Sequence, residues 1–152
     1  MTKFEDVTRA LADQRREHFL TCKPSELILL ALEDLEKTEK MTDVYRVNME
    51  WYHAPLDNGI CNVCLGGAVL AQTVKLTPSM CWGGDADGNV EGRIFALDSF
   101  RTGHIGEGLS EMGIQLPFNV RPTVRMRDYE RDPVDFKSGL RWIAKHLGER
   151  GL

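Results

Sequence analysis

The sequence predicts a mostly α-helical α+β domain, with about five or six helices around a buried central helix and one or two short strands. Residues 24–40 and 132–147 both have helical apolar spacing and well-marked helix starts. Residues 60–76 are apolar nearly throughout, which is typical of a helix buried on all sides. Residues 43–53 instead alternate apolar and polar side chains, as a half-buried strand does.

Length and composition fit one globular domain over residues 1–152. The chain is 42% hydrophobic and 28% charged, with a formal net charge of -4. A chain of this length can bury a sizeable core without disulfides or metal. No apolar run approaches the roughly 18 residues of a membrane span, and the mild acidity argues against nucleic-acid binding. We therefore expect neither a membrane protein nor a basic nucleic-acid binder.

Two helices are expected at the start of the chain. The first covers residues 3–19, in a peripheral segment over 1–20, and its middle is polar on all sides. The second covers residues 24–40, where Pro24 suits the first helical turn. Its wide apolar face consists of Leu27, Ile28, Ala31, Leu32 and Leu35.

The strand and the central helix follow. In the strand over 43–53, the inward-facing positions are expected to be Tyr45, Val47, Met49 and Trp51. The central helix, over 60–76, contains Gly66 and Gly67, and each glycine costs roughly 1 kcal/mol relative to alanine. The usual reason to keep glycine in a helix is close approach of another backbone, so we expect one here.

The second half of the chain begins with a loop over 77–89. A helix over 91–100 and a short helix from Thr102 to Met112 are expected next, followed by an extended segment over 117–129. The last helix has the clearest start, because Asp132 is a good N-cap and Pro133 fits the first helical position.

The four cysteines are Cys22, Cys61, Cys64 and Cys81. The first residues lack the pattern of a signal peptide, so we expect a cytoplasmic protein with reduced thiols. Cys61 and Cys64 form a C-x-x-C motif, which can present two sulfurs to one zinc ion. His53 and Cys81 would complete a Cys3His set, although strong zinc signatures pair two such motifs.

Two other chemistries are open to the same cysteines. Cys64 near a helix start could act as a nucleophile, with His104 as its base and Asp98 or Asn119 orienting the histidine. A thioredoxin-like redox pair would require a βαβ pattern, which the preceding segment lacks. The favoured interpretation is structural: no cofactor is expected, and Cys61, Cys64 and Cys81 serve as small buried apolar side chains.

A partner-binding surface is expected around Trp82, Asp85 and Asp87 in the glycine-rich loop, together with the exposed side of the first helix. The acidic stretch does not fit a calcium loop, because the sixth and twelfth positions counted from Asp85 hold Val90 and Ala96. Trp51 is expected to lie in the core, covered by Trp82.

Two motifs carry a resemblance to small uncharacterised proteins of bacteriophages and prophages. These are C-x-V-C-L-x-G-A at 61–68 and L-D-x-x-R-x-G at 97–103, and the likeness extends over residues 25–147. The resemblance implies an accessory phage protein that acts in the bacterial cytoplasm. Such proteins often bind and redirect a host protein, including those of defence systems.

The resulting expectation is a non-enzymatic phage protein that binds a host macromolecule. Two alternatives remain open at this point. One is a thiol-dependent hydrolase that uses Cys64 and His104, and the other is a structural zinc domain that uses His53, Cys61, Cys64 and Cys81.

Overall fold

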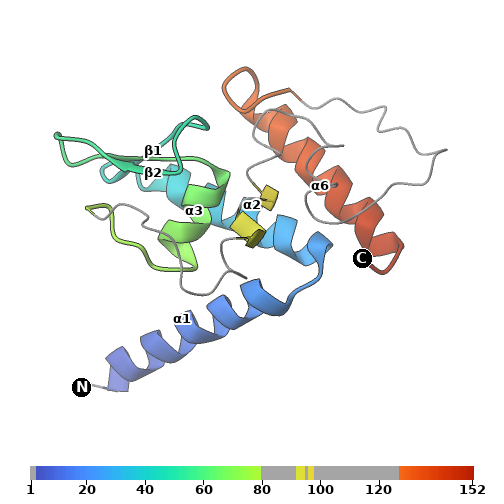
Figure 1. The fold of residues 1–152 in the computed structure, drawn as a ribbon, viewed down its shortest axis with the longest axis horizontal. Coiled ribbons are helices and arrows are strands. Elements are labelled where there is room, and N and C mark those ends of the chain that lie inside the picture. Colours follow the sequence, from blue (N-terminus) through green and yellow to red (C-terminus); the bar gives the residue numbers. More distant parts are fainter. Residues whose placement is uncertain (1–2, 80–91, 95, 98–126) are drawn as a thin grey trace.

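The computed structural model describes residues 3–79, 92–94, 96–97 and 127–152, and these form a mostly helical α+β fold, as predicted. Figure 1 shows a long central helix, α2, with the other elements arranged around it. The elements in chain order are α1 (Lys3–Thr21), α2 (Pro24–Lys40), β1 (Tyr45–Val47), β2 (His53–Pro55), β3 (Cys61–Val63), α3 (Leu65–Gln72) and α6 (Pro133–Glu149).

Helix α2 is the centre of the packing, because it contacts both α3 and α6. It starts at Pro24, and the Glu26 carboxylate accepts a hydrogen bond of 3.1 Å from the backbone N–H of Lys23. This contact satisfies one of the donors that a helix start leaves unpaired. The predicted apolar face is buried as expected, with Ile28, Ala31 and Leu35 fully inaccessible to solvent.

The three described strands form one small sheet in the order β1-β3-β2. Strand β3 pairs in parallel with β1, where Tyr45 lies opposite Cys61, and antiparallel with β2, where His53 lies opposite Val63. The prediction of a helix from residue 60 was wrong at this point, because Cys61–Val63 is the central strand. All three of its residues are buried, and a short segment buried on both faces has no periodicity to distinguish it from a buried helix.

The predicted strand over 43–53 is also broken in two. Tyr45 and Met49 are buried as expected, but Trp51 is 52% exposed, so its predicted core position was wrong. A turn separates β1 from β2: the backbone N–H of Trp51 donates to the Asn48 carbonyl at 3.1 Å, and the N–H of Glu50 donates to the Asn48 side chain at 3.0 Å. The turn interrupts the alternation of buried and exposed side chains, so Trp51 no longer lies on the buried face.

Helix α3 is the buried central helix that the sequence predicts, although it is shorter than residues 60–76. Every residue from Leu65 to Ala71 is buried. A Cβ atom at Gly67 would lie 1.5 Å from the backbone oxygen of Tyr52. The expected close approach of a second backbone is therefore confirmed, and that backbone belongs to the residue just before β2.

Helix α6 packs on the other side of α2. As predicted, Asp132 caps it, because the aspartate side chain accepts a hydrogen bond of 3.0 Å from the N–H of Asp135. Polar contacts also join α6 and its preceding turn to α2. Tyr129 donates to Glu39 at 2.6 Å, and Arg141 pairs with Glu36 at 2.5 Å.

Several predicted elements lie outside the described residues. Of the predicted helix over 91–100, residues 92–94 and 96–97 are described and are helical, with Ile94 and Leu97 buried. The short helix from Thr102 to Met112 and the extended segment up to residue 126 are not among the described residues. Within the described part of the chain, no helix has the length and apolar character needed to cross a membrane.

Candidate functional site

The two cysteines of the C-x-x-C motif lie in different surroundings. Cys61 is on β3 and its sulfur is 3.5 Å from Nδ1 of His53, in a small cluster with Tyr45. Cys64 is the N-cap of α3, where its sulfur accepts a hydrogen bond from the N–H of Gly67 at 3.5 Å, and it belongs to the main core. Neither residue has solvent-accessible surface, which confirms the expectation that both belong to the core.

This arrangement brings together part of the predicted zinc set. His53 and Cys61 are neighbours, whereas Cys64 packs with the main core cluster. Cys81, the fourth predicted ligand, lies outside the described residues.

Of the residues in the predicted thiol site, Cys64 is the one that belongs to the described part of the structure. Cys64 lies at a helix start, and a helix N-terminus favours the thiolate form. However, its side chain is completely buried, so a substrate has no access to its sulfur without a rearrangement. His104, Asp98 and Asn119 lie outside the described residues.

Of the predicted partner-binding surface, the first helix can be described, whereas Trp82, Asp85 and Asp87 lie outside the described residues. In α1, Val7 and Leu11 are 58% and 60% exposed. They are four residues apart and therefore share one face of the helix. Helix α1 runs along one side of the molecule, and its N-terminal end lies at the edge of the view (Figure 1).

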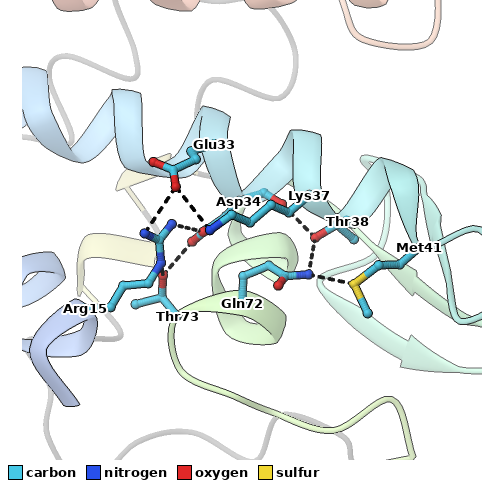
Figure 2. Close-up of polar contacts among 8 residues, drawn as sticks. All are labelled: Arg15, Glu33, Asp34, Lys37, Thr38, Met41, Gln72 and Thr73. Atoms are coloured by element: carbon cyan, nitrogen blue, oxygen red, sulfur yellow. Dashed lines mark hydrogen bonds and ion pairs between the residues drawn. The ribbon is translucent and has the colours of Figure 1, made fainter. Parts of the chain in front are cut away.

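The other half of α1 is held by a buried polar network around Asp34 (Figure 2). Arg15 forms an ion pair with Asp34 and donates from Nε to the Thr73 hydroxyl at 3.1 Å. Thr73 in turn donates to the second Asp34 oxygen at 2.6 Å. These three residues come from α1, from α2 and from the end of α3, so the network joins three helices.

Asp34 has no exposed surface, and both of its carboxylate oxygens have a partner. Burial raises the pKa of its carboxyl group, and the Thr73 hydrogen bond and the Arg15 guanidinium oppose that rise. A buried carboxylate is tolerated only when such partners replace its hydration. The sequence signal was available, because Asp34 interrupts the apolar face of residues 24–40, but Arg15 and Thr73 are distant in sequence.

The network continues along α2 on the side that faces α3 (Figure 2). The hydroxyl of Thr38 donates to the Asp34 backbone carbonyl at 2.7 Å and accepts from the Gln72 amide at 3.2 Å. Glu33, at the exposed edge, lies between Arg15 and Lys37, at 3.5 and 3.1 Å respectively. The contacts of Arg15, together with fully buried Phe19, hold the C-terminal half of α1, whereas Val7 and Leu11 lie outside the core.

A further group of side chains was not recognised from the sequence. Within the part of the chain that the structure describes, His18, Cys22 and Glu26 form a group of three metal-ligating residues, with their ligand atoms all within 4.8 Å of one another. The spacing H-x3-C-x3-E is visible in the sequence. On one continuous helix, residues eight apart would be separated by about 12 Å along the axis. The break between α1 and α2 brings these residues together.

Comparison with known proteins adds no relative to this description. The chain matches no protein-family model, and comparison with curated proteins and with solved structures finds no significant similarity. A function for this chain is therefore to be inferred from its own residues.

Proposed function

We propose that this chain is a non-enzymatic phage accessory protein that binds a host protein in the bacterial cytoplasm through α1. The observation that carries the proposal is the α1 strip, defined as Val7 and Leu11, whose side chains are 58% and 60% exposed on one helix face. The resemblance to phage and prophage proteins suggests the setting, and the net charge of -4 argues against nucleic acid as the partner.

The energetics of the α1 strip support binding. Full burial of a valine or leucine side chain stabilises by about 1.5–3 kcal/mol relative to its exposed state. A partner that covers the α1 strip would gain part of this free energy from each residue. Lys3 and Gln14 are both exposed and continue the same face beyond the strip, so polar groups border the apolar contact. An apolar centre with a polar border is the usual composition of a protein interface.

The anchoring of α1 is a second supporting observation. The Arg15–Asp34–Thr73 network holds the C-terminal half of the helix against α2 and α3, so the helix that carries the α1 strip is attached to the core while Val7 and Leu11 stay exposed to a partner. The hydrolase alternative with Cys64, His104 and Asp98 has weaker support, because Cys64 is completely buried.

Photo-crosslinking from two positions on α1 tests the proposal. A crosslinking amino acid is placed at position 11 or, as the matched control, at exposed position 13, about 200° around the helix. Each full-length protein is irradiated in bacterial lysate. We expect one discrete crosslinked product from position 11 and none from position 13. Identical products from both positions, or no product from position 11, would contradict the proposal.

Competition with unlabelled protein tests whether the product depends on the α1 strip. Wild type and an Asp13→Asn variant are expected to compete with crosslinking from position 11, whereas Leu11→Glu is expected not to. Leu11 is already 60% exposed, so its replacement should change the free energy of unfolding by less than about 0.5 kcal/mol. Equal competition by Leu11→Glu would show that the product does not report on the α1 strip.

A further inference from the structure

The junction between α1 and α2 gathers three different metal-ligating side chains. His18 lies in the last turn of α1, Cys22 in the connection, and Glu26 in the first turn of α2. One ligand atom from each residue lies within 4.8 Å of the other two. Zinc bonds of about 2.0–2.3 Å place tetrahedral ligands roughly 3.3–3.6 Å apart, so a contraction of at most about 1.5 Å would complete the site.

The three residues differ in how freely they can make that adjustment. Cys22 is 5% exposed, and its backbone N–H donates to the His18 carbonyl at 2.8 Å, so the cysteine is held in place. His18 and Glu26 are exposed, and their side chains can rotate toward the sulfur. One oxygen of Glu26 accepts the hydrogen bond from the Lys23 N–H, which orients the carboxylate and leaves its other oxygen for a ligand.

We propose that His18, Cys22 and Glu26 bind a zinc ion at the α1–α2 junction. An imidazole nitrogen, a thiolate sulfur and a carboxylate oxygen together suit zinc, whereas magnesium and calcium prefer oxygen ligands alone. Three protein ligands leave the fourth tetrahedral position for a solvent molecule. This proposal is independent of partner binding through the α1 strip.

The charges around the junction are consistent with this assignment. One thiolate and one carboxylate balance the two positive charges of zinc, and the thiol proton is released to solvent as the sulfur–zinc bond forms. Arg93 donates from Nη1 to the Cys22 carbonyl at 2.9 Å, and the same nitrogen lies 3.6 Å from the sulfur. The Arg93 guanidinium therefore lies beside the Cys22 sulfur, where its positive charge favours the thiolate form.

Zinc titration of the full chain, freed of metal by a chelator, tests the site directly. Affinity is measured by competition with a chromophoric chelator, and cobalt is used as a spectroscopic substitute for zinc. We expect one ion per chain and, with cobalt, a sulfur-to-metal charge-transfer band. Removing a residue that only hydrogen-bonds to a metal ligand commonly weakens metal affinity by about tenfold or more. Removing a ligand itself should cost at least as much, so His18→Asn, Cys22→Ser and Glu26→Gln are each expected to weaken zinc affinity by at least about tenfold.

Two features keep the test independent of folding defects. His18 and Glu26 are exposed, and Glu26→Gln retains an acceptor for the Lys23 N–H, so circular dichroism should be unchanged in these variants. Cys61→Ser is the control, because it removes a cysteine from the alternative His53–Cys61 pair. The proposal is overturned if the wild type binds no zinc, or if zinc affinity and the cobalt band survive Cys22→Ser. Survival in Cys22→Ser together with loss in Cys61→Ser would place the ion at the His53–Cys61 pair instead.

Discussion

At position 67 the absence of a side chain lets two backbone segments touch. The Cβ of any other residue would lie 1.5 Å from the Tyr52 oxygen and 2.7 Å from the Tyr52 carbonyl carbon. Backbone atoms cannot rotate away as the end of a flexible side chain can. Gly66 differs, because its nearest neighbour at 2.9 Å is a side-chain methyl group of Ile94. Of the two glycines, Gly67 therefore sets the distance between α3 and the chain entering β2.

Replacing Gly67 with alanine should destabilise the protein severely. The added methyl group forces α3 away from the backbone of Tyr52, and we expect a loss of roughly 3 kcal/mol or more in the free energy of unfolding. Urea denaturation followed by circular dichroism measures this change. Gly92→Ala is the matched control, because its Cβ would meet no atom within 4 Å and its helical position favours alanine by up to about 1 kcal/mol. Equal denaturation midpoints for the two variants would contradict this account of Gly67.

At the scale of elements, helix α2 is joined to its neighbours by apolar and polar contacts together. Its apolar face packs into the core, and two glutamates at its C-terminal half reach the α6 region. Glu39 accepts from Tyr129 at 2.6 Å and pairs with Lys137 at 2.5 Å, with the two partners on different oxygens. The Tyr129 ring also packs edge-on against Phe136, with ring centres 5.8 Å apart. Tyr129 therefore links the turn before α6 both to α2 and to the core.

The Tyr129–Glu39 contact predicts a specific alkaline instability. Burial and the Glu39 carboxylate raise the pKa of Tyr129 well above its ordinary value. The unfolded chain therefore releases the tyrosine proton first, and the stabilisation is lost progressively above about pH 10. Tyr129→Phe should cost roughly 1–2 kcal/mol at neutral pH and should flatten the alkaline decline. The decline should not vanish, since burial also raises the pKa of Tyr45.

Urea denaturation between pH 7 and 11 measures both parts of this prediction. The neutral-pH loss tests the hydrogen bond, and the slope above pH 10 tests the proton linkage. An unchanged alkaline slope in Tyr129→Phe would mean that Tyr129 titrates in the folded protein as it does in the unfolded chain.

For the molecule as a whole, the described side chains of α1 are attached unequally along the helix, with the buried and partly buried ones in its C-terminal half. Its C-terminal half contributes fully buried Phe19 and the Arg15–Asp34 pair, whereas its N-terminal half carries the α1 strip. Segments with few buried contacts open at low free energy, whereas core helices open only near the free energy of global unfolding. Helix α2, packed between α3 and α6, belongs to the second group.

Amide hydrogen exchange should reveal this gradient. We expect the first three turns of α1 to exchange at least about tenfold faster than α2, with protection increasing toward Phe19. Arg15→Met removes the guanidinium from Asp34 and should extend fast exchange to the end of α1. Mass spectrometry of peptide fragments resolves the two halves. Protection of residues 3–12 equal to that of α2 would mean that another surface already covers the α1 strip.

The extent to which the sequence predicts this structure differs between elements. The starts of α2 and α6 are predictable because Pro24, Asp132 and Pro133 act within one helical turn. Gly67 also indicated a close backbone contact before its partner was known. Strand β3 is not predictable in this way, because a short segment buried on both faces has no alternation. The exposure of Trp51 follows from a turn that the alternating pattern conceals.

The candidate sites show the same division. The sequence alone predicts the mostly helical fold class, the amphipathic helices and the burial of Cys61 and Cys64. These features depend on the local spacing and hydrophobicity of the residues. Only the tertiary structure decides that Cys61 meets His53, and that His18, Cys22 and Glu26 converge where α1 ends. The physical reason is that capping and amphipathicity act over one or two turns, whereas these side-chain groups depend on how the chain changes direction between elements.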